Sequence, residues 1–305
     1  MSVIDLQSFQ SLVDRRYREI VEYEYASQID QIGEMYSIET SDSYEERRGS
    51  VGELPTWDEF NGSLNYVRMY EQYNTITTHR EFAQALRWTR QMVDDDLTGI
   101  MRGDRYRRMV RSGLFTRQQH AARLFNFATS NDTYFYTRSE GVPLASASHT
   151  TRTPGVSTAS GFSNLSTQAL TQVAYRTARI TMRRTRNDQG QITNVMANCL
   201  FVPIDLEPKA REIIETDRQP ESANNAVNPE YNTATIVVLI HWNDTNDWAI
   251  CNKEMMHENC IWFNRVNPEY QQIVDFETKQ LKSSGYGRWG SMVMDWRWLH
   301  FSSVS

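Results

Sequence analysis

The stretch from residue 190 to residue 214 places the tightest limits on what this chain can fold into. It reads GQITNVMANCLFVPIDLEPKAREII and follows a turn signal at 188–190. The short apolar run Cys199–Val202, followed by a proline, is typical of a buried strand with a definite end. Asp205 is expected to cap a short helix behind that strand. The apolar face of this helix consists of Leu206, Ala210, Ile213 and Ile214. The stretch predicts a core of strand and helix, and it contains no nucleophile, phosphate-binding loop or metal-binding cluster.

Length and composition indicate a folded chain with a substantial core. Its 305 residues are enough for one large or two modest domains, and a hydrophobic content of 39% argues against disorder. Charges come too early in the sequence for a signal peptide. The longest apolar run, residues 234–242, is too short to span a bilayer. We therefore expect a soluble, non-secreted protein without a membrane partner.

The residues that most often carry chemistry show no catalytic or metal-ligand spacing. The three cysteines, Cys199, Cys251 and Cys260, are odd in number and are expected to be buried thiols. The six histidines form no HxH or HExxH pattern, and no GxSxG segment is present. The carboxylates of Asp94–Asp96 are adjacent, so on a helix they point in different directions, which favours a solvated or arginine-paired helix end over a metal site. We predict no catalytic residue, cofactor or metal.

The charge distribution favours contacts between parts of the chain or between copies of it. Residues 1–60 carry 14 acidic and 5 basic side chains, whereas residues 102–123 carry seven arginines against one aspartate. The arginines could form a phosphate-binding face, or they could pair with the acidic segment of the same or a neighbouring subunit. The complementary charge favours pairing. Only four of the 32 basic residues are lysines, and arginine is enriched at protein interfaces, although codon bias explains the imbalance equally well.

Hydrophobic periodicity predicts three helical regions. They are residues 5–26, residues 91–111 continuing from 116 to 128 after a break at Ser112–Gly113, and residues 166–184. Residues 30–48 are acidic and lack periodicity, which indicates an extended arm or loop.

The remaining patterns are typical of β-structure. Residues 50–89 predict a protruding β-rich loop with a hairpin turn at Asn61–Gly62 and strands near 64–69 and 74–78. Its last part, 82–89, alternates like a strand, yet a capping box before it favours a helix. The aromatic C-terminal region 259–305 predicts further strands. Two hydrophobic clusters on either side of 145–163 suggest two lobes, the second inserted into the first.

Five segments follow one another along the chain: GELPTWDEFNG, LRWTRQMVDDDL, GVPLASASH with GFSNLSTQAL, LFVPIDLEPKAREII with VNPEYN, and GYGRWGSMVMDWRW. In this order they resemble segments of the Mu-type major head proteins of tailed bacteriophages. The resemblance implies an α+β protein with the Hong Kong 97-type capsid fold. It also implies a major capsid protein that self-assembles into the icosahedral head shell around a double-stranded DNA genome. That function places it in the virion, after assembly in the cytoplasm of the bacterial host.

The same resemblance implies a set of parts and partners. The parts are an N-terminal arm with an amphipathic helix at 1–49, an extended β-hairpin loop at 50–89, a peripheral domain with a spine helix at 90–135 and 256–305, and an axial domain at 136–255. The partners are further copies of the chain in hexamers and pentamers, a portal protein, scaffolding and decoration proteins, and packaged DNA on the inner face. Contacts between subunits are expected at Tyr17, Trp57, Tyr66, Arg102, Arg105, Arg108 and Arg111.

Two departures from the family and two alternatives qualify this interpretation. Ala145 stands where these head proteins often carry phenylalanine. No lysine precedes Lys209, so the isopeptide lock that some shells of this fold form from a hairpin lysine is chemically impossible, and we expect non-covalent contacts only. An encapsulin-like compartment would share the fold and enclose enzymes. A DNA-binding or nuclease protein using the Arg102–Arg123 helix is the less favoured alternative.

Overall fold

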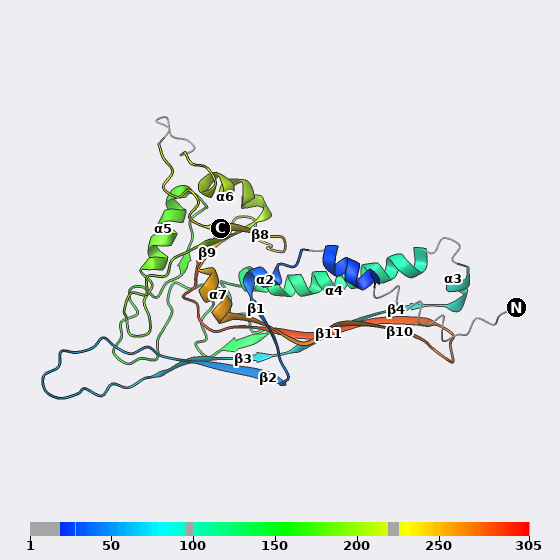
Figure 1. Cartoon of the computed structure of the whole chain (residues 1–305), viewed down its shortest axis with the longest axis horizontal. Helices are drawn as coiled ribbons and strands as arrows, with labels where there is room; N and C mark the ends of the chain where they lie inside the picture. Colours follow the sequence, from blue (N-terminus) through cyan, green and yellow to red (C-terminus); the bar gives the residue numbers. More distant parts are fainter. Residues whose placement is uncertain (1–18, 28, 96–99, 219–225, 305) are drawn as a thin grey trace. The chain divides into compact units, whose positions relative to one another are not determined.

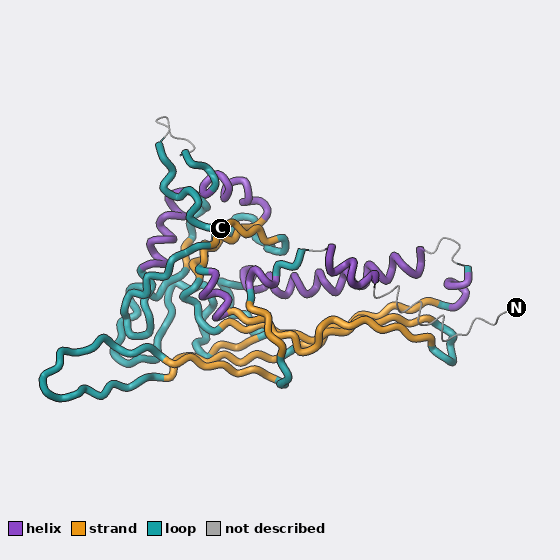
Figure 2. The backbone as a smooth tube through the Cα atoms, in the orientation of Figure 1, coloured by secondary structure: helices purple, strands orange, loops and turns teal. Residues whose placement is uncertain are grey.

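The computed structural model describes residues 19–27, 29–95, 100–218 and 226–304, shown in Figures 1 and 2. The side chains of residues 93, 94 and 100–104 are outside the description. The chain divides into two compact units, each made of three separate segments. The small unit consists of Met1–Gln31, Arg80–His120 and Asn264–Trp289. The large unit consists of Ile32–His79, Ala121–Phe263 and Gly290–Ser305.

The small unit packs one long helix against long antiparallel strands. The helix is α4 (Ile100–Asn126), and the strands are β4 (Arg80–Trp88), β10 (Cys260–Val274) and β11 (Leu281–Val293), of which the small unit contains the parts up to His120, from Asn264 and up to Trp289. The short helix α3 (Arg90–Asp94) follows β4 in the chain. β4 pairs antiparallel with β11, from Trp88 opposite Leu281 to Arg80 opposite Trp289. One four-stranded sheet has the order β1-β10-β11-β4.

The apolar face of α4 forms the core of the small unit. It consists of Tyr106, Met109, Val110 and Leu114, and it contacts Ile20, Val21 and Tyr25 of the N-terminal segment, together with Leu86 and Tyr270. Residues 19–27 are helical, which confirms the end of the predicted helix at 5–26, and its earlier residues up to 18 lie outside the described residues. The periodic pattern of both helices is explained by this shared core.

The predicted break of the long helix at Ser112–Gly113 is wrong. α4 runs without interruption through both residues, and the Thr116 hydroxyl donates back to the Ser112 carbonyl at 2.8 Å instead of capping a new helix. Gly113 serves close packing, because a Cβ at this position would lie 2.9 Å from the Tyr270 hydroxyl. At residues 82–89 the strand alternative is correct, since pairing of β4 with β11 outweighs the capping box.

The large unit is built around a five-stranded sheet with the order β6-β12-β9-β7-β8. These strands are β6 (Leu165–Ser166), β12 (Leu299–Ser302), β9 (Trp248–Cys251), β7 (Cys199–Pro203) and β8 (Thr235–Leu239). β7 is parallel to β8 and antiparallel to β9, and every residue of β7 is buried. The buried strand expected at Cys199–Val202 is therefore confirmed and lies inside the sheet.

Helices α5 (Gln172–Arg183) and α6 (Glu207–Ile214) cover this sheet, and α7 (Lys253–Asn259) follows β9. They share a cluster with the strands that includes Tyr175, Leu200 and Ile213. α5 begins at Gln172, not at 166, because residues 165–166 pair with β12 and Thr171 provides the cap, accepting from the Ala174 amide at 3.1 Å.

The expected cap at Asp205 is also wrong, although the apolar face of the helix is as predicted. A 3₁₀ turn, η1 (Ile204–Leu206), leads directly into α6, and no side chain caps either helix. Because the turn continues into α6, Asp205 lies inside a hydrogen-bonded turn and has no free first turn to cap.

Residues 32–51 form regular elements of the large unit, where the sequence indicated an extended arm or a loop. They form α2 (Ile32–Met35), β1 (Ser37–Thr40) and β2 (Glu45–Val51). Ile32 and Met35 are buried, because two apolar residues three apart on one turn find a place in the core. β2, β3 (Glu71–Thr78) and β5 (Tyr136–Arg138) form a three-stranded antiparallel sheet.

Candidate assembly surfaces

The hairpin of β2 and β3 carries a long tip without regular structure, residues 52–70, which we call the exposed loop. It projects from the ends of both strands, at the left of Figure 1. No strand forms near 64–69, which corrects the prediction; Gly62 adopts a φ of +94° as the turn signal required, but the flanking residues find no partner strand. Strand pairing begins only at the base, where the Gly52 amide donates to the Tyr70 carbonyl at 2.9 Å.

The exposed loop presents large apolar side chains to solvent. Trp57 is 98% exposed and Tyr66 is 90% exposed. The other exposed apolar residues of the loop are Leu54, Phe60, Leu64, Val67, Met69 and Tyr70. Aromatic residues are enriched in protein interfaces, and large exposed apolar patches are typical of interaction sites. Of the predicted contact residues, the structure brings Trp57 and Tyr66 together on this loop.

Two of the α4 arginines form ion pairs within the small unit. Arg107 and Arg111 both form ion pairs with Glu24, whose carboxylate is fully buried, and the Arg107 Nε lies 3.1 Å from it. This pairing links the acidic N-terminal segment to α4 within the small unit. Arg105 and Arg108 are exposed on the same helix. The side chain of Arg102 and the whole of Tyr17 lie outside the described residues.

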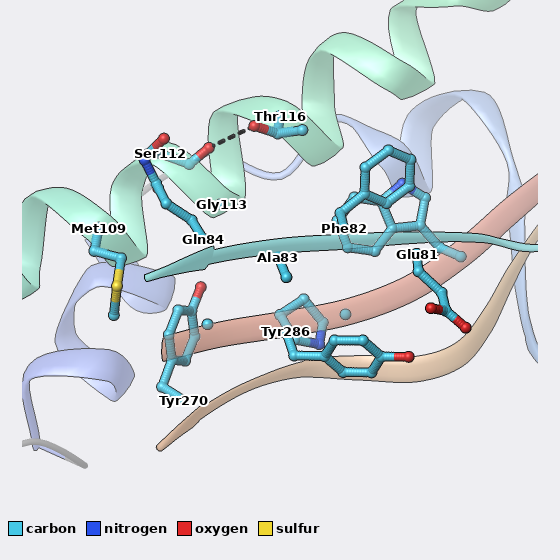
Figure 3. A pocket seen from close by; sticks show the side chains of 14 residues that line it. Glu81, Phe82, Ala83, Gln84, Met109, Ser112, Gly113, Thr116, Tyr270 and Tyr286 are labelled. Carbon is cyan, nitrogen blue, oxygen red and sulfur yellow. Dashed lines mark hydrogen bonds between the residues drawn. The ribbon is translucent and has the colours of Figure 1, made fainter. Parts of the chain in front are cut away.

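A pocket of about 410 Å³ lies in the small unit between α4 and the strands (Figure 3). Met109 and Thr116 of α4 line one wall, and Tyr270 and Tyr286 line the other. Glu81 is the one acid among its described lining residues, and none of them is His, Cys, Lys or Arg. This lining provides neither a nucleophile with a base nor a set of metal ligands.

His149 is a buried structural residue. Its Nδ1 lies 3.0 Å from Glu140, its Nε2 lies 3.0 Å from the Asn164 side-chain oxygen, and its ring stacks on Trp296 at 4.0 Å. Burial alone would raise the pKa of Glu140, but the hydrogen bond from His149 and the charge of Arg138 together lower it. These contacts join three separate parts of the chain and give His149 a structural role.

The other candidate chemical groups have equally ordinary surroundings. All three cysteines are free and buried, as expected, and burial raises the pKa of Cys251 and Cys260 well above the usual value, which keeps these thiols inert. In the part of the chain that the structure describes, no three His, Cys, Asp or Glu side chains gather into a possible metal site. None of the described helices is both long and apolar enough to cross a membrane.

A helix-covered sheet, a long helix packed along extended strands and a projecting hairpin together define the class of phage capsid subunits. The chain resembles many solved phage structures, three of which illustrate the likeness. The bacteriophage JBD30 capsid has 16% identity and a TM-score of 0.54, covering 72% of this chain and 92% of that one. The cyanophage P-SCSP1u capsid has 13% identity and a TM-score of 0.58, covering 90% and 87%. The Mycobacterium phage Patience protein has 10% identity and a TM-score of 0.57, covering 99% and 89%. At these identities the likeness shows the Hong Kong 97-type fold.

The family itself is shown by sequence. The model of the phage capsid protein family matches residues 72–300, and the chain belongs to that family. It is a structural protein and not an enzyme: a major capsid protein that forms the phage head shell and is located in the virion capsid. A search of curated proteins found no match.

Proposed function

We propose that the exposed loop is the main surface by which each subunit holds its neighbours in the shell. The observation that carries this proposal is the near-complete exposure of Trp57 and Tyr66 on a loop anchored to the large unit at its base. Burying one large aromatic side chain removes about 150–250 Å² of surface, so these two alone account for a sizeable part of a typical interface of about 1,200–2,000 Å². At about 25 cal/mol per Å², their burial supplies roughly 10 kcal/mol before the costs of ordering.

The exposed arginines of α4 form a second proposed contact. Arg105 and Arg108 are exposed on α4, and a guanidinium group can form bidentate bonds with a carboxylate of a neighbour. Arg102 and Tyr17 stay proposals on the sequence alone, and Arg111, which pairs with Glu24 of its own subunit, stays a proposed contact. The division into arm, extended loop, peripheral domain and axial domain, and the Mu-type subclass, also stay proposals.

The proposed assembly consists of hexamers and pentamers that close around double-stranded DNA. Portal and scaffolding proteins are proposed partners because a shell of this class needs an opening and a guide for its curvature. The JBD30 capsid is decorated with minor capsid protein trimers, and a comparable decoration protein is proposed for this shell. DNA inside purified particles that resists added nuclease would support the genome role, whereas an enclosed enzyme would favour the encapsulin-like alternative.

Electron microscopy combined with light scattering tests the role of the exposed loop. The unaltered protein is expected to form shells or rings of five and six subunits. The double variant W57A/Y66A is expected to remain as folded, unassembled subunits. Tyr44→Ala is a matched control, because Tyr44 is 70% exposed but lies outside the loop, between β1 and β2. Normal shells from W57A/Y66A would overturn the proposal, and so would an equal loss of assembly in the control.

A further inference from the structure

The base of the exposed loop is held by a carboxylate from a distant part of the chain. The Glu53 amide donates to both oxygens of Asp188, at 3.0 and 3.1 Å, across a separation of 135 residues. The same carboxylate accepts from the Gln72 side-chain amide at 3.2 Å and from the Thr153 hydroxyl at 3.3 Å. Asp188 is only 5% exposed and Gln72 only 8%, so the carboxylate that joins both strands of the loop base is largely buried.

Further hydrogen bonds hold Asp188 and Gln72 in place. The Gln72 side-chain oxygen accepts from the Arg152 amide at 3.1 Å, and its nitrogen also donates to the Thr153 hydroxyl at 3.0 Å. The Gln189 side chain donates to the Glu53 carbonyl at 2.9 Å. Each polar group of this network has a partner, which is the condition under which a buried polar network specifies one geometry.

The backbone around Asp188 is itself rigid. The Asn187 side-chain oxygen accepts from the amides of Gln189 and Gln191 at 3.1 and 2.9 Å, which closes a tight turn. Gly190 completes that turn with a φ of +81°, a conformation that glycine adopts without strain. The carboxylate is therefore presented from a fixed position on the body of the large unit.

Gly52 allows the loop to pass directly over this carboxylate. A Cβ at residue 52 would lie 2.3 Å from Asp188 Oδ2 and 3.0 Å from the Tyr70 carbonyl. A larger residue would have to displace Asp188 or open the base of the loop. Glycine at position 52 therefore permits the close approach between the base of the loop and the turn that carries Asp188.

The hydrogen bonds described for residues 54–69 stay within the loop itself, as in the bond from the Asn65 side chain to Asp58 at 2.9 Å. The direction of the loop is consequently set at its base and not along its length. A loop free to swing would lose more conformational entropy on meeting a neighbour, and that cost would be subtracted from the affinity of the contact.

From this geometry we infer that Asp188 is a positioning residue for shell assembly: it clamps the base of the exposed loop so that the loop's apolar side chains are presented in one direction. This inference rests on the proposed role of the loop in holding neighbours. The clamp acts before contact is made and lowers the subunit concentration at which shells form.

Asp188→Asn is the direct test, because it keeps the shape of the side chain and replaces one acceptor by a donor facing the Glu53 and Gln72 donors. Glu230→Gln is the matched control. Glu230 is a carboxylate of the large unit, 3% exposed and paired with Arg176 and Arg179, and it has no contact with the loop. We expect D188N to raise the threshold concentration for assembly roughly tenfold or more, with E230Q close to the unaltered protein.

A second variant and a second measurement keep the inference testable if D188N folds poorly. Gly52→Ala leaves Asp188 unchanged and pushes its carboxylate away, so G52A is expected to raise the assembly threshold as well. Hydrogen exchange on unassembled subunits should show lost protection at the Glu53 amide in both variants, with β7 still protected.

Assembly of D188N or G52A at the unaltered threshold would overturn the inference, as would an equal defect in E230Q. If W57A/Y66A assembles normally, the proposed role of the loop itself fails; if only the clamp variants assemble normally, the loop keeps its role and the clamp does not.

Discussion

The sheet around β7 and the exposed loop contain the same kinds of apolar side chain. These side chains are buried in the sheet and exposed in the loop. In β7 every position is buried, and Phe201 packs against Phe125 with ring centres 4.9 Å apart. In the loop, Trp57 is almost fully exposed and Phe60 is 69% exposed. The apolar side chains of the sheet are covered within one subunit, whereas those of the loop are open to contact with another molecule.

This difference separates the stability of the subunit from the strength of the shell. Apolar surface that is buried on folding contributes to the free energy of unfolding of the subunit. Apolar surface that stays exposed contributes only when a neighbour covers it. Substitutions in the two regions should therefore have independent effects, one on unfolding and the other on assembly.

The largest difference between the regions is expected when phenylalanine is replaced by alanine in each of them separately and the free energy of unfolding is compared. Phe201→Ala should lower the free energy of unfolding by about 3–5 kcal/mol, because it leaves a cavity beside Phe125. Phe60→Ala should change it by no more than about 0.5 kcal/mol. Urea unfolding of unassembled subunits measures both values. Similar losses from the two variants would mean that the loop packs on its own subunit, and the contrast between the regions would not hold.

The sequence predicts the first region better than the second. The run Cys199–Val202 and the apolar face at Ala210 and Ile213 are local patterns that the core preserves. The exposed loop was correctly expected to protrude, but its internal strands were wrong, because alternation of side chains at 64–69 does not supply a partner strand. Local signals also failed at two other places: at Asp205 a 3₁₀ turn continues into α6, and at Ser112–Gly113 the helix continues where it packs closely on Tyr270.

The residues that anchor the loop could not be found from the sequence. Asp188 has the appearance of an ordinary turn residue, and Gln72 has that of an exposed strand residue. Their shared function depends on contacts over more than 100 positions in the sequence, with Glu53 in one case and with Asp188 itself in the other. Trp57 and Tyr66, by contrast, were named as contact residues from the resemblance, and their exposure agrees with that proposal.

An effect of intermediate size on the free energy of unfolding is expected from pH. The histidine that carries this effect lies in the sheet around β7, whereas the exposed loop contains no histidine. His300 lies on β12 beside Ile250, and burial lowers its pKa to about 4. An unfolded chain has a histidine pKa near about 6.5. Between these values the unfolded state binds a proton that the folded state does not, so stability falls as the pH falls from about 6.5 towards about 4.

The size of this effect follows from linkage. Lowering the pH from about 7 to about 5 should remove about 2 kcal/mol of stability through His300 alone. His300→Gln does not titrate and can still contact the Ser166 hydroxyl, which lies 3.3 Å from His300 Nε2. Urea unfolding at several pH values should therefore give a flatter profile for H300Q than for the unaltered subunit. Identical slopes for the two proteins would show that His300 does not titrate in this range.

The smallest effect on unfolding is expected where the effect on assembly is largest. In the double variant W57A/Y66A, the free energy of unfolding of the isolated subunit should stay within about 0.5 kcal/mol of the unaltered value. Both side chains are almost fully exposed, so their removal creates no cavity and leaves no buried polar group without a partner. Chemical unfolding of unassembled subunits, with Phe201→Ala measured for comparison, checks this value.

A loss of more than about 1 kcal/mol would mean that the two side chains already stabilise their own subunit. Failure of that variant to form shells would then no longer identify the loop as a contact between subunits. An unchanged free energy of unfolding together with lost assembly would leave contact with a neighbour as the role of these side chains.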